Sequence, residues 1–360
     1  MSHECYASNA QALRTVVDSP LDDLLAGAGC VTFIEDDTQV RVGWLHAGGD
    51  GLIVTAHVDE GVAGRTRFWC DAQQWSDWLA PSLPVPSWDT LPPAWQASAA
   101  SLTLATGRMS GDPMEAPAPL ASWPQGMAIA REPVETAWRV GIVLVRDDRR
   151  LALQYLDGAT SWLRERCQQA TPGDVPLDPA GLPERRCPLV AGWAELPAAL
   201  CDSQLDGGAV LLDVAADVRS GEYWLLDGEH AIAMRDGQPA GRRVVTLERR
   251  ASGGHEDANA HPPPTCTRLF AVIAEGRIPI PWLMAWRAGH PAGHPAATAN
   301  ALAADRITLW RDGAPWASGR LLSFGDGCLA VQIDGTPASP DAPVDEISGG
   351  DPMGVHSATT

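Results

Sequence analysis

The hexapeptide MRDGQP at residues 234–239 recurs as WRDGAP at residues 310–315. Each copy follows an apolar run and precedes a Gly-Arg step, at 241–242 and at 319–320, which opens another apolar run. Asp-Gly between alternating apolar residues is the strongest short-range signal of a β-hairpin, because a type I′ turn needs positive φ at both central residues. The chain therefore contains one small β unit twice.

The proline in each hairpin fits the same turn. A two-residue turn makes Arg311 and Ala314 the hydrogen-bonded pair, so Trp310 lies opposite Pro315 in the next, non-hydrogen-bonded pair. The N–H that proline lacks is no loss there, provided that the outer side of the strand is unpaired. We therefore expect a free strand edge at each proline, which suits strand addition by a protein partner.

Composition excludes several classes of function. The chain has 360 residues, 45% of them apolar, and a formal charge of −19, which argues against nucleic acid and anionic membranes as partners. All 26 basic residues are arginine, so a P-loop lysine and a Schiff-base lysine are excluded.

The sequence also indicates a compartment. Residues 1–29 lack a basic region followed by an apolar core, and no window approaches 18 uninterrupted apolar residues, so neither a signal peptide nor a membrane span is expected. The eight cysteines are scattered, without a C-x-x-C pair, as is typical of reduced thiols in a cytoplasmic protein.

The predicted fold is mainly β with short helices. Residues 1–185 form a mixed α+β N-terminal domain, and the two β units occupy 186–250 and 267–335. Between the units, 251–266 is a Gly- and Pro-rich linker, and 336–360 is a disordered acidic tail.

Hydrophobic periodicity and turn residues place the individual elements. Strands are expected at 31–34, 40–45, 52–58, 137–145, 151–155, 187–193, 209–212, 222–226, 269–280 and 329–333. Short helices are expected at 21–25, 94–105, 195–201 and 281–286, with a helical turn around Trp75 and Trp78.

Two patterns raise the question of an enzyme. His290 and His294 have the spacing of two metal ligands on a helix, but the proline after each disfavours a helix. Ser252, Glu256 and Asn259 have the spacing of the chemotaxis phosphatases, but they lie between Gly-Gly and a triple proline. We predict no catalytic residue, no cofactor and no metal, and keep an acyl-phosphate phosphatase or metal-dependent hydrolase as the lesser alternative.

Residues 187–334 resemble two tandem SpoA (surface presentation of antigens) domains. The best match runs from IPIPWL at 278–283 through RITLWRDG at 306–313 to GCLAVQI at 327–333. The first unit matches more loosely. A Pro-Gly-Asp-like turn that is usual in the family after its short helix is missing from both units. The resemblance implies small β-barrel-like domains, as in type III secretion cytoplasmic-ring proteins of the SctQ/YscQ/HrcQ family and in flagellar motor switch proteins.

The resemblance implies a structural function. The chain would be a scaffold subunit of the cytoplasmic ring, or sorting platform, of a type III secretion injectisome, located in the cytoplasm at the inner membrane. Implied partners are the ATPase with its regulator or stator, substrate–chaperone complexes, the inner-membrane-ring adaptor, the export apparatus and further copies of the chain. Some family members also make an internally initiated C-terminal fragment, but a start at Met234 would interrupt the first hairpin. The alternative within the same resemblance is a flagellar motor switch protein.

Apolar residues of the two units are the candidate partner contacts. They are Leu196, Leu200, Trp282, Leu283, Trp286, Trp310 and Trp316.

Overall fold

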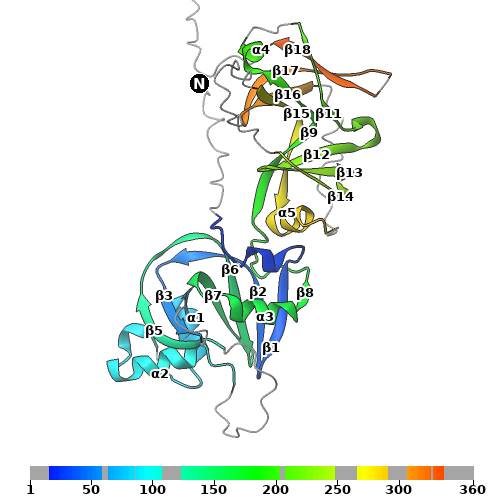
Figure 1. Cartoon of the computed structure of the whole chain (residues 1–360). Coiled ribbons are helices and arrows are strands. Elements are labelled where there is room, and N and C mark those ends of the chain that lie inside the picture. Colours follow the sequence, from blue (N-terminus) through cyan, green and yellow to red (C-terminus); the bar gives the residue numbers. More distant parts are fainter. Residues whose placement is uncertain are drawn as a thin grey trace, which may run out of the picture. The chain divides into compact units, whose positions relative to one another are not determined.

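The computed structural model describes residues 16–58, 64–84, 86–107, 123–202, 207–247, 266–290, 306–325 and 327–335 (Figure 1). The linker at 251–265, the tail at 336–360 and the residues Ser252, Glu256, Asn259 and His294 lie outside these ranges. The described chain is mostly antiparallel sheet with a few short helices, which confirms the predicted fold class.

The chain forms two compact units that are each assembled from separate segments. The first unit contains residues 1–189, 220–249 and 275–299, and the second contains 190–219, 250–274 and 300–360. The limits between them fall inside two long strands, β9 (Glu184–Pro197) and β15 (Cys266–Pro279). The predicted domain limits follow the sequence repeat, and as limits of independent domains they remain a prediction.

An eight-stranded antiparallel sheet with the order β5-β3-β4-β7-β6-β2-β1-β8 dominates the first unit. The predicted N-terminal strands are confirmed, whereas β4, β5 and the three-residue β8 were not predicted. β8 has the turn-like sequence TPG and is held in the sheet by its pairing with β1. The strands are β1 (Cys30–Glu35), β2 (Thr38–Gly49), β3 (Leu52–His57), β4 (Arg65–Cys70), β5 (Gln125–Arg131), β6 (Val134–Arg146), β7 (Arg149–Gly158) and β8 (Thr171–Gly173).

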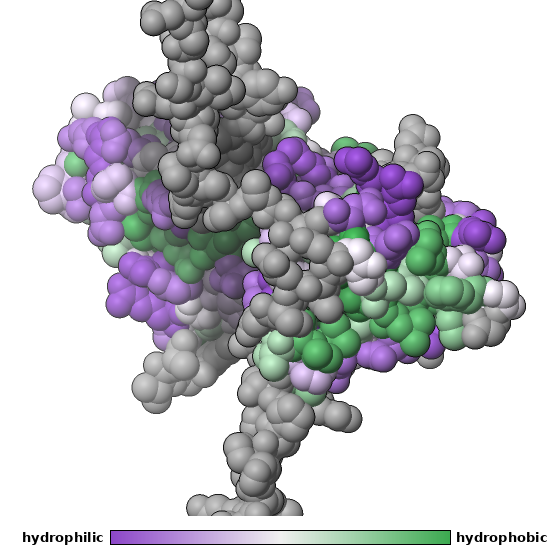
Figure 2. All heavy atoms as spheres, turned by 90° about the horizontal axis from the view of Figure 1, so that it is seen from above, coloured by the Kyte–Doolittle hydropathy of each residue, from purple (hydrophilic) through white to green (hydrophobic). Residues whose placement is uncertain are grey.

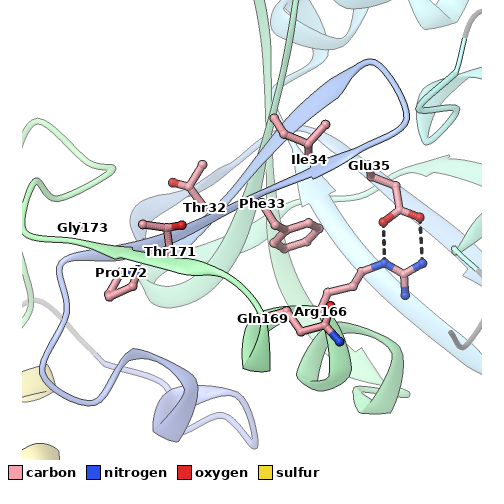
Figure 3. A pocket seen from close by; sticks show the side chains of 9 residues that line it. All are labelled: Thr32, Phe33, Ile34, Glu35, Arg166, Gln169, Thr171, Pro172 and Gly173. Atoms are coloured by element: carbon pink, nitrogen blue, oxygen red, sulfur yellow. Dashed lines mark hydrogen bonds and ion pairs between the residues drawn. The ribbon is translucent and has the colours of Figure 1, made fainter.

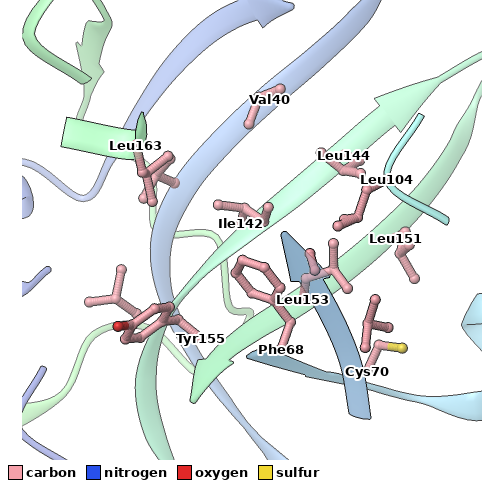
Figure 4. Packing of buried hydrophobic residues seen from close by; sticks show 14 of the residues in the cluster. Val40, Phe68, Cys70, Leu104, Ile142, Leu144, Leu151, Leu153, Tyr155 and Leu163 are labelled. Atoms are coloured by element: carbon pink, nitrogen blue, oxygen red, sulfur yellow. The ribbon is translucent and has the colours of Figure 1, made fainter. Parts of the chain in front are cut away.

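Aliphatic and aromatic side chains from alternate strand positions form the core of this sheet (Figure 4). Short helices cover it: the 3-10 helices η1 (Asp22–Leu25) and η3 (Trp88–Thr90), and the α-helices α1 (Ala72–Leu79), α2 (Pro93–Thr103) and α3 (Ser161–Gln168). Gly126 lets α2 lie directly on β5, since a Cβ there would come within 1.9 Å of the Ala100 carbonyl oxygen.

Indole groups hold α1 against the C-terminal end of α2. Trp75 Nε1 donates to Thr103 Oγ1 at 2.8 Å, and Trp78 Nε1 donates to the Thr103 carbonyl at 3.0 Å. The last carbonyls of a helix have no partner within the helix, so a buried helix end needs such donors. These tryptophans are core residues.

After residue 184 the elements follow the duplicated order. The first copy contains β9, α4 (Ala198–Asp202), β10 (Ala209–Leu211), β11 (Val214–Ala215), η4 (Val218–Ser220), β12 (Glu222–Asp227), β13 (His230–Arg235) and β14 (Gln238–Thr246). The second contains β15, α5 (Ile280–Arg287), β16 (Arg306–Arg311), β17 (Ala314–Ser323) and β18 (Leu329–Gly335). The predicted helix at 195–201 is wrong in its limits, because β9 continues to Pro197 and only 198–202 is helical.

The two Asp-Gly hairpins have the predicted type I′ geometry and register. φ is 50° and 81° in the first turn and 49° and 81° in the second, at Asp-Gly in each case. Met234 pairs with Pro239, and Trp310 pairs with Pro315. β14 is the last strand of its sheet, and β17 pairs with β18 only from Ser318 onward. Among the described strands, neither proline therefore faces an outer neighbour.

Strands of both copies belong to one ten-stranded sheet, in which the strands of the second unit follow the order β10-β18-β17-β16-β15-β9. β10 belongs to the first copy and pairs with β18 of the second, with Val210 opposite Val331. Both residues lie in a core shared with Ala271 and Leu309. The duplicated units therefore interleave, and neither copy completes this sheet alone.

A buried carboxylate connects three segments of the first unit. The Asp227 side chain is 0% exposed, with Oδ1 2.9 Å from Arg185 Nη1 and Oδ2 2.5 Å from Arg287 Nη2. These residues come from the end of β12, the start of β9 and the end of α5. The arginine side chains are 44% and 33% exposed, so the charge of Asp227 depends on them for stabilisation while they also reach water.

Asp22, in η1, gives the first unit a specific pH dependence. Burial raises the pKa of Asp22 from 3.8 to about 6, although the Ser19 N–H and Arg185 act in the opposite direction. The folded chain therefore binds this proton more tightly than the unfolded chain, and the stability gained is present below pH 3.8 and lost as pH rises through about 6.

Asp22→Asn is expected to remove this contribution. Between about pH 4 and pH 6 the stability of the variant should rise relative to wild type by roughly 1 kcal/mol, because the side chain is only partly buried. Urea unfolding at a series of pH values measures the difference. A difference that is constant across this interval would contradict the raised pKa.

Candidate functional site

The candidate functional features among the described residues are surfaces for protein contact. They include no group of three or more His, Cys, Asp or Glu side chains that could hold a metal ion. His290 is exposed beyond α5, where its N–H donates to the Ala285 carbonyl at 2.9 Å. No helix within the described ranges is long and apolar enough to cross a membrane.

The candidate contacts Leu196 and Leu200 do not share a helix. Leu196 is half-buried near the end of β9 and packs against the core of the second unit. Leu200 lies in α4 and is 49% exposed. Of the pair, Leu200 is the residue that presents an apolar side chain to solvent.

The candidate contacts in α5 are covered by the chain's own residues. Trp282, Leu283 and Trp286 are 7%, 2% and 1% exposed. Ile280 and Met284, also in α5, pack against the core of the first unit. The Gly27 N–H donates to the carbonyl of Pro281 at 2.8 Å, next to η1. The short helix therefore serves the packing of the first unit.

Trp310 belongs to an aromatic row on the second unit's sheet. Trp310 in β16 pairs with Phe270 in β15, whose ring centroid is 6.3 Å from that of Trp193 in β9. Their sequence neighbours Leu269 and Leu309 lie in the core, and side chains alternate along a strand. Trp310 and Phe270 therefore lie on the opposite, outer face, both half-exposed.

A second apolar row crosses the same outer face. Leu211, Ala330 and Leu322 are aligned across β10, β18 and β17. Leu211 is 56% exposed, and Phe324, which follows β17, is 48% exposed. On the surface seen in Figure 2, hydrophobic areas lie next to hydrophilic ones. Trp316 packs toward the core instead, because the bulge in the hairpin shifts its side.

These outer-face residues could have been found from the sequence. Once the hairpin fixes Leu309 as a core residue, strand alternation assigns Trp310 to the outer face. Phe270 and Leu211 need the strand pairings β15·β16 and β10·β18, which join residues far apart in the chain. Local sequence therefore indicates Trp310 as an outer-face residue, whereas Phe270 and Leu211 can be placed only when the long-range strand pairings are known.

A hollow of about 570 Å³ lies beside β1 in the first unit (Figure 3). β2 pairs with β1 along its whole length, whereas β8 covers only Cys30–Thr32 on the other side. The hollow begins where β8 ends. Its lining is formed by Thr32, Phe33, Ile34, Glu35, Arg166, Gln169, Thr171, Pro172 and Gly173.

An ion pair and aromatic contacts fix the wall of this hollow. Arg166 Nε and Nη2 donate to the two oxygens of Glu35 at 2.7 and 2.8 Å, and the arginine side chain is 5% exposed. The Arg166 guanidinium also lies 5.3 Å from the ring centre of Trp123. Trp123 in turn contacts Phe33 and Trp162 edge to face. A buried bidentate pair of this kind holds α3 at a fixed position beside β1.

Comparison with known families assigns the first part of the chain. Residues 16–165 match the family model of the SepQ protein N-terminal domain. The match includes β1 to β7 and ends before the duplicated hairpins, so the SpoA assignment of the C-terminal region remains a prediction. No curated protein matches the chain.

The matched domain is one of a family of secretion proteins. Its fold of antiparallel strands and short helices agrees with the N-terminal domain predicted from the sequence. Residues 16–165 are thus similar to the SepQ N-terminal domain, whose family is the SctQ/YscQ type of type III secretion sorting-platform protein.

Proposed function

We propose that the chain is a structural scaffold subunit of the cytoplasmic ring of a type III secretion injectisome. The observation that carries this proposal is the SepQ N-terminal domain at residues 16–165. The duplicated hairpin unit, with its resemblance to tandem SpoA domains, supports it independently. The family is a structural one rather than a known class of enzyme.

In this proposal the second unit is a docking platform. Its outer face presents Trp310 and Phe270 in one row and Leu211 in another, and Leu200 is exposed on α4. Exposed aromatic and aliphatic side chains with polar residues between them, here Ser318 and Arg320, are typical of protein–protein contacts. We assign to this face the ATPase with its regulator or stator.

The remaining contacts follow from the same role. The N-terminal domain would meet the inner-membrane-ring adaptor, and the ring would form by self-association of the chain at the cytoplasmic side of the inner membrane. Substrate–chaperone complexes and the export apparatus would be further partners. An internally initiated C-terminal fragment would have to supply its own sheet partners, since β10 and β18 come from different copies.

Recovery of the secretion ATPase and its regulator with the full-length chain from crosslinked cells tests this function. A flagellar motor switch role predicts that loss of the protein abolishes motility and leaves secretion intact. The ring role predicts the reverse phenotype.

A further inference from the structure

The second half of β1 is an open strand edge. In an antiparallel pair, alternate residues direct both N–H and C=O toward the same neighbouring strand. Along β1, one set of alternate residues directs its backbone groups to β2. The other set directs its groups to β8, but β8 extends only as far as Thr32. Phe33 and Glu35 direct these groups toward β2, so Ile34 is the residue whose N–H and C=O point outward beyond β8 and meet no described strand. Such an edge is a template for another chain.

The hollow beside this edge has room for a strand. α3 lies across it from β1, and the Glu35–Arg166 ion pair spans the two elements at its base (Figure 3). Gln169 at the C-terminal end of α3 is exposed on the far side. Ile34, on the near side, is 64% exposed and is the most prominent apolar side chain of β1.

We propose that the edge at Phe33–Glu35 binds an extended segment of a partner protein, which adds as a strand in line with β8 and carries basic residues. This inference does not depend on the ring role. Main-chain hydrogen bonds would supply affinity, and side chains at alternate positions would supply selectivity. Side chains on one face of the added strand would be apolar and would contact Ile34. Side chains on its other face would lie over Gln169 and the Glu35–Arg166 ion pair.

Charge indicates the basic character of the segment. Asp36 and Asp37 are exposed at one end of the open edge, and Asp174 is exposed just after β8 at the other. Next to β1, Arg166 is paired with Glu35, whereas Arg41, whose Nη2 lies 3.6 Å from the sulfur of Cys30, keeps its positive charge against the three aspartates. The open edge therefore lies between exposed carboxylates, whose negative potential favours a basic segment.

The same charges disfavour a second copy of this chain. β8 blocks antiparallel pairing of two β1 edges unless the pair is centred near Glu35. That register would place Glu35 opposite its own counterpart, with Asp36 and Asp37 close by. Like charges directly opposite each other in a sheet are destabilising.

Hydrogen–deuterium exchange of the full chain with designed peptides tests the proposal. The probe is an eight-residue peptide of alternating valine and threonine with arginine at both ends. We expect it to slow exchange of the Ile34 amide, which β2 does not bind, at concentrations up to about 1 mM. A peptide with glutamate at both ends, and an arginine-ended peptide N-methylated at alternate residues, should give no protection.

Matched variants locate the binding. Ile34→Lys should weaken binding of the arginine-ended peptide by roughly threefold to tenfold, through lost apolar contact and added repulsion. Trp95→Lys, at an apolar residue that is 52% exposed and lies in α2 rather than beside β1 or its aspartates, should leave binding unchanged. Both substitutions are at exposed positions, so the folded state is expected to persist, which circular dichroism verifies.

Several results would overturn the proposal. These are no protection of the Ile34 amide at the highest concentration, equal protection by both charge forms, or protection confined to the other edge strands β5, β10 and β14. The same amide could also exchange slowly in the absence of peptide, and more slowly as the protein concentration rises. That result would identify a second copy of the chain as the occupant and would also refute the proposal.

Discussion

Replacing Arg185 and Arg287 together by methionine is expected to lower the free energy of unfolding of the first unit by about 3–5 kcal/mol. The Asp227 side chain is 0% exposed and has both arginines as its charge partners. Their removal leaves a buried carboxylate without compensation. Methionine keeps much of the aliphatic volume, so packing changes contribute little. Urea unfolding followed by tryptophan fluorescence measures the loss.

Removing the carboxylate instead of the arginines should lower the free energy of unfolding much less. Asp227→Asn leaves arginines that are 44% and 33% exposed and can be hydrated, so we expect a loss of about 1–2 kcal/mol. Adding Asp227→Leu to the double-methionine variant should recover most of its stability, because no buried charge remains. Equal costs for the two deletions, or no recovery in the triple variant, would show that Asp227 is not the buried charge described.

Gly313→Val is expected to destabilise the second unit by about 1–3 kcal/mol and to abolish secretion in cells. Gly313 has φ of 81°, and a Cβ added there would meet nothing within 4 Å. The whole effect therefore comes from forcing a β-branched residue into the left-handed region. Unfolding of the purified chain and the amount of secreted substrate are the two readouts.

Asparagine at the same position is the matched control. It tolerates positive φ, so Gly313→Asn should cost less than about 1 kcal/mol and preserve secretion. Gly325→Ala is a second control, because a Cβ added at Gly325 would also meet open space, whereas φ at Gly325 is not positive. Wild-type stability and secretion in Gly313→Val would contradict the type I′ turn.

Local chemistry made the hairpins predictable to the residue. Asp-Gly dictates the turn, the turn dictates the register, and the register places Trp310 opposite Pro315. The helix near Leu200 was misplaced, because a five-residue helix has too few positions to show a period and β9 is longer than its apolar run.

Contacts between residues far apart in the chain could not be predicted from the sequence. Glu35 and Arg166 are 131 positions apart, and the hollow that they border is formed only when β8 stops short on β1. Likewise, nothing local indicates that β10 leaves its own copy to pair with β18. The candidate contact Trp286 shows the converse error, since its apolar character reflects burial in the first unit rather than an exposed binding face.

Affinity purification of the full-length chain from crosslinked cells, with quantification of the secretion ATPase and its regulator, tests the scaffold function most directly. We predict that both proteins are recovered with the wild-type chain and with Gly313→Asn, and that recovery falls sharply with Gly313→Val. Absence of both proteins from the wild-type preparation, together with turnover of an acyl phosphate that is lost in Glu256→Ala, would contradict it.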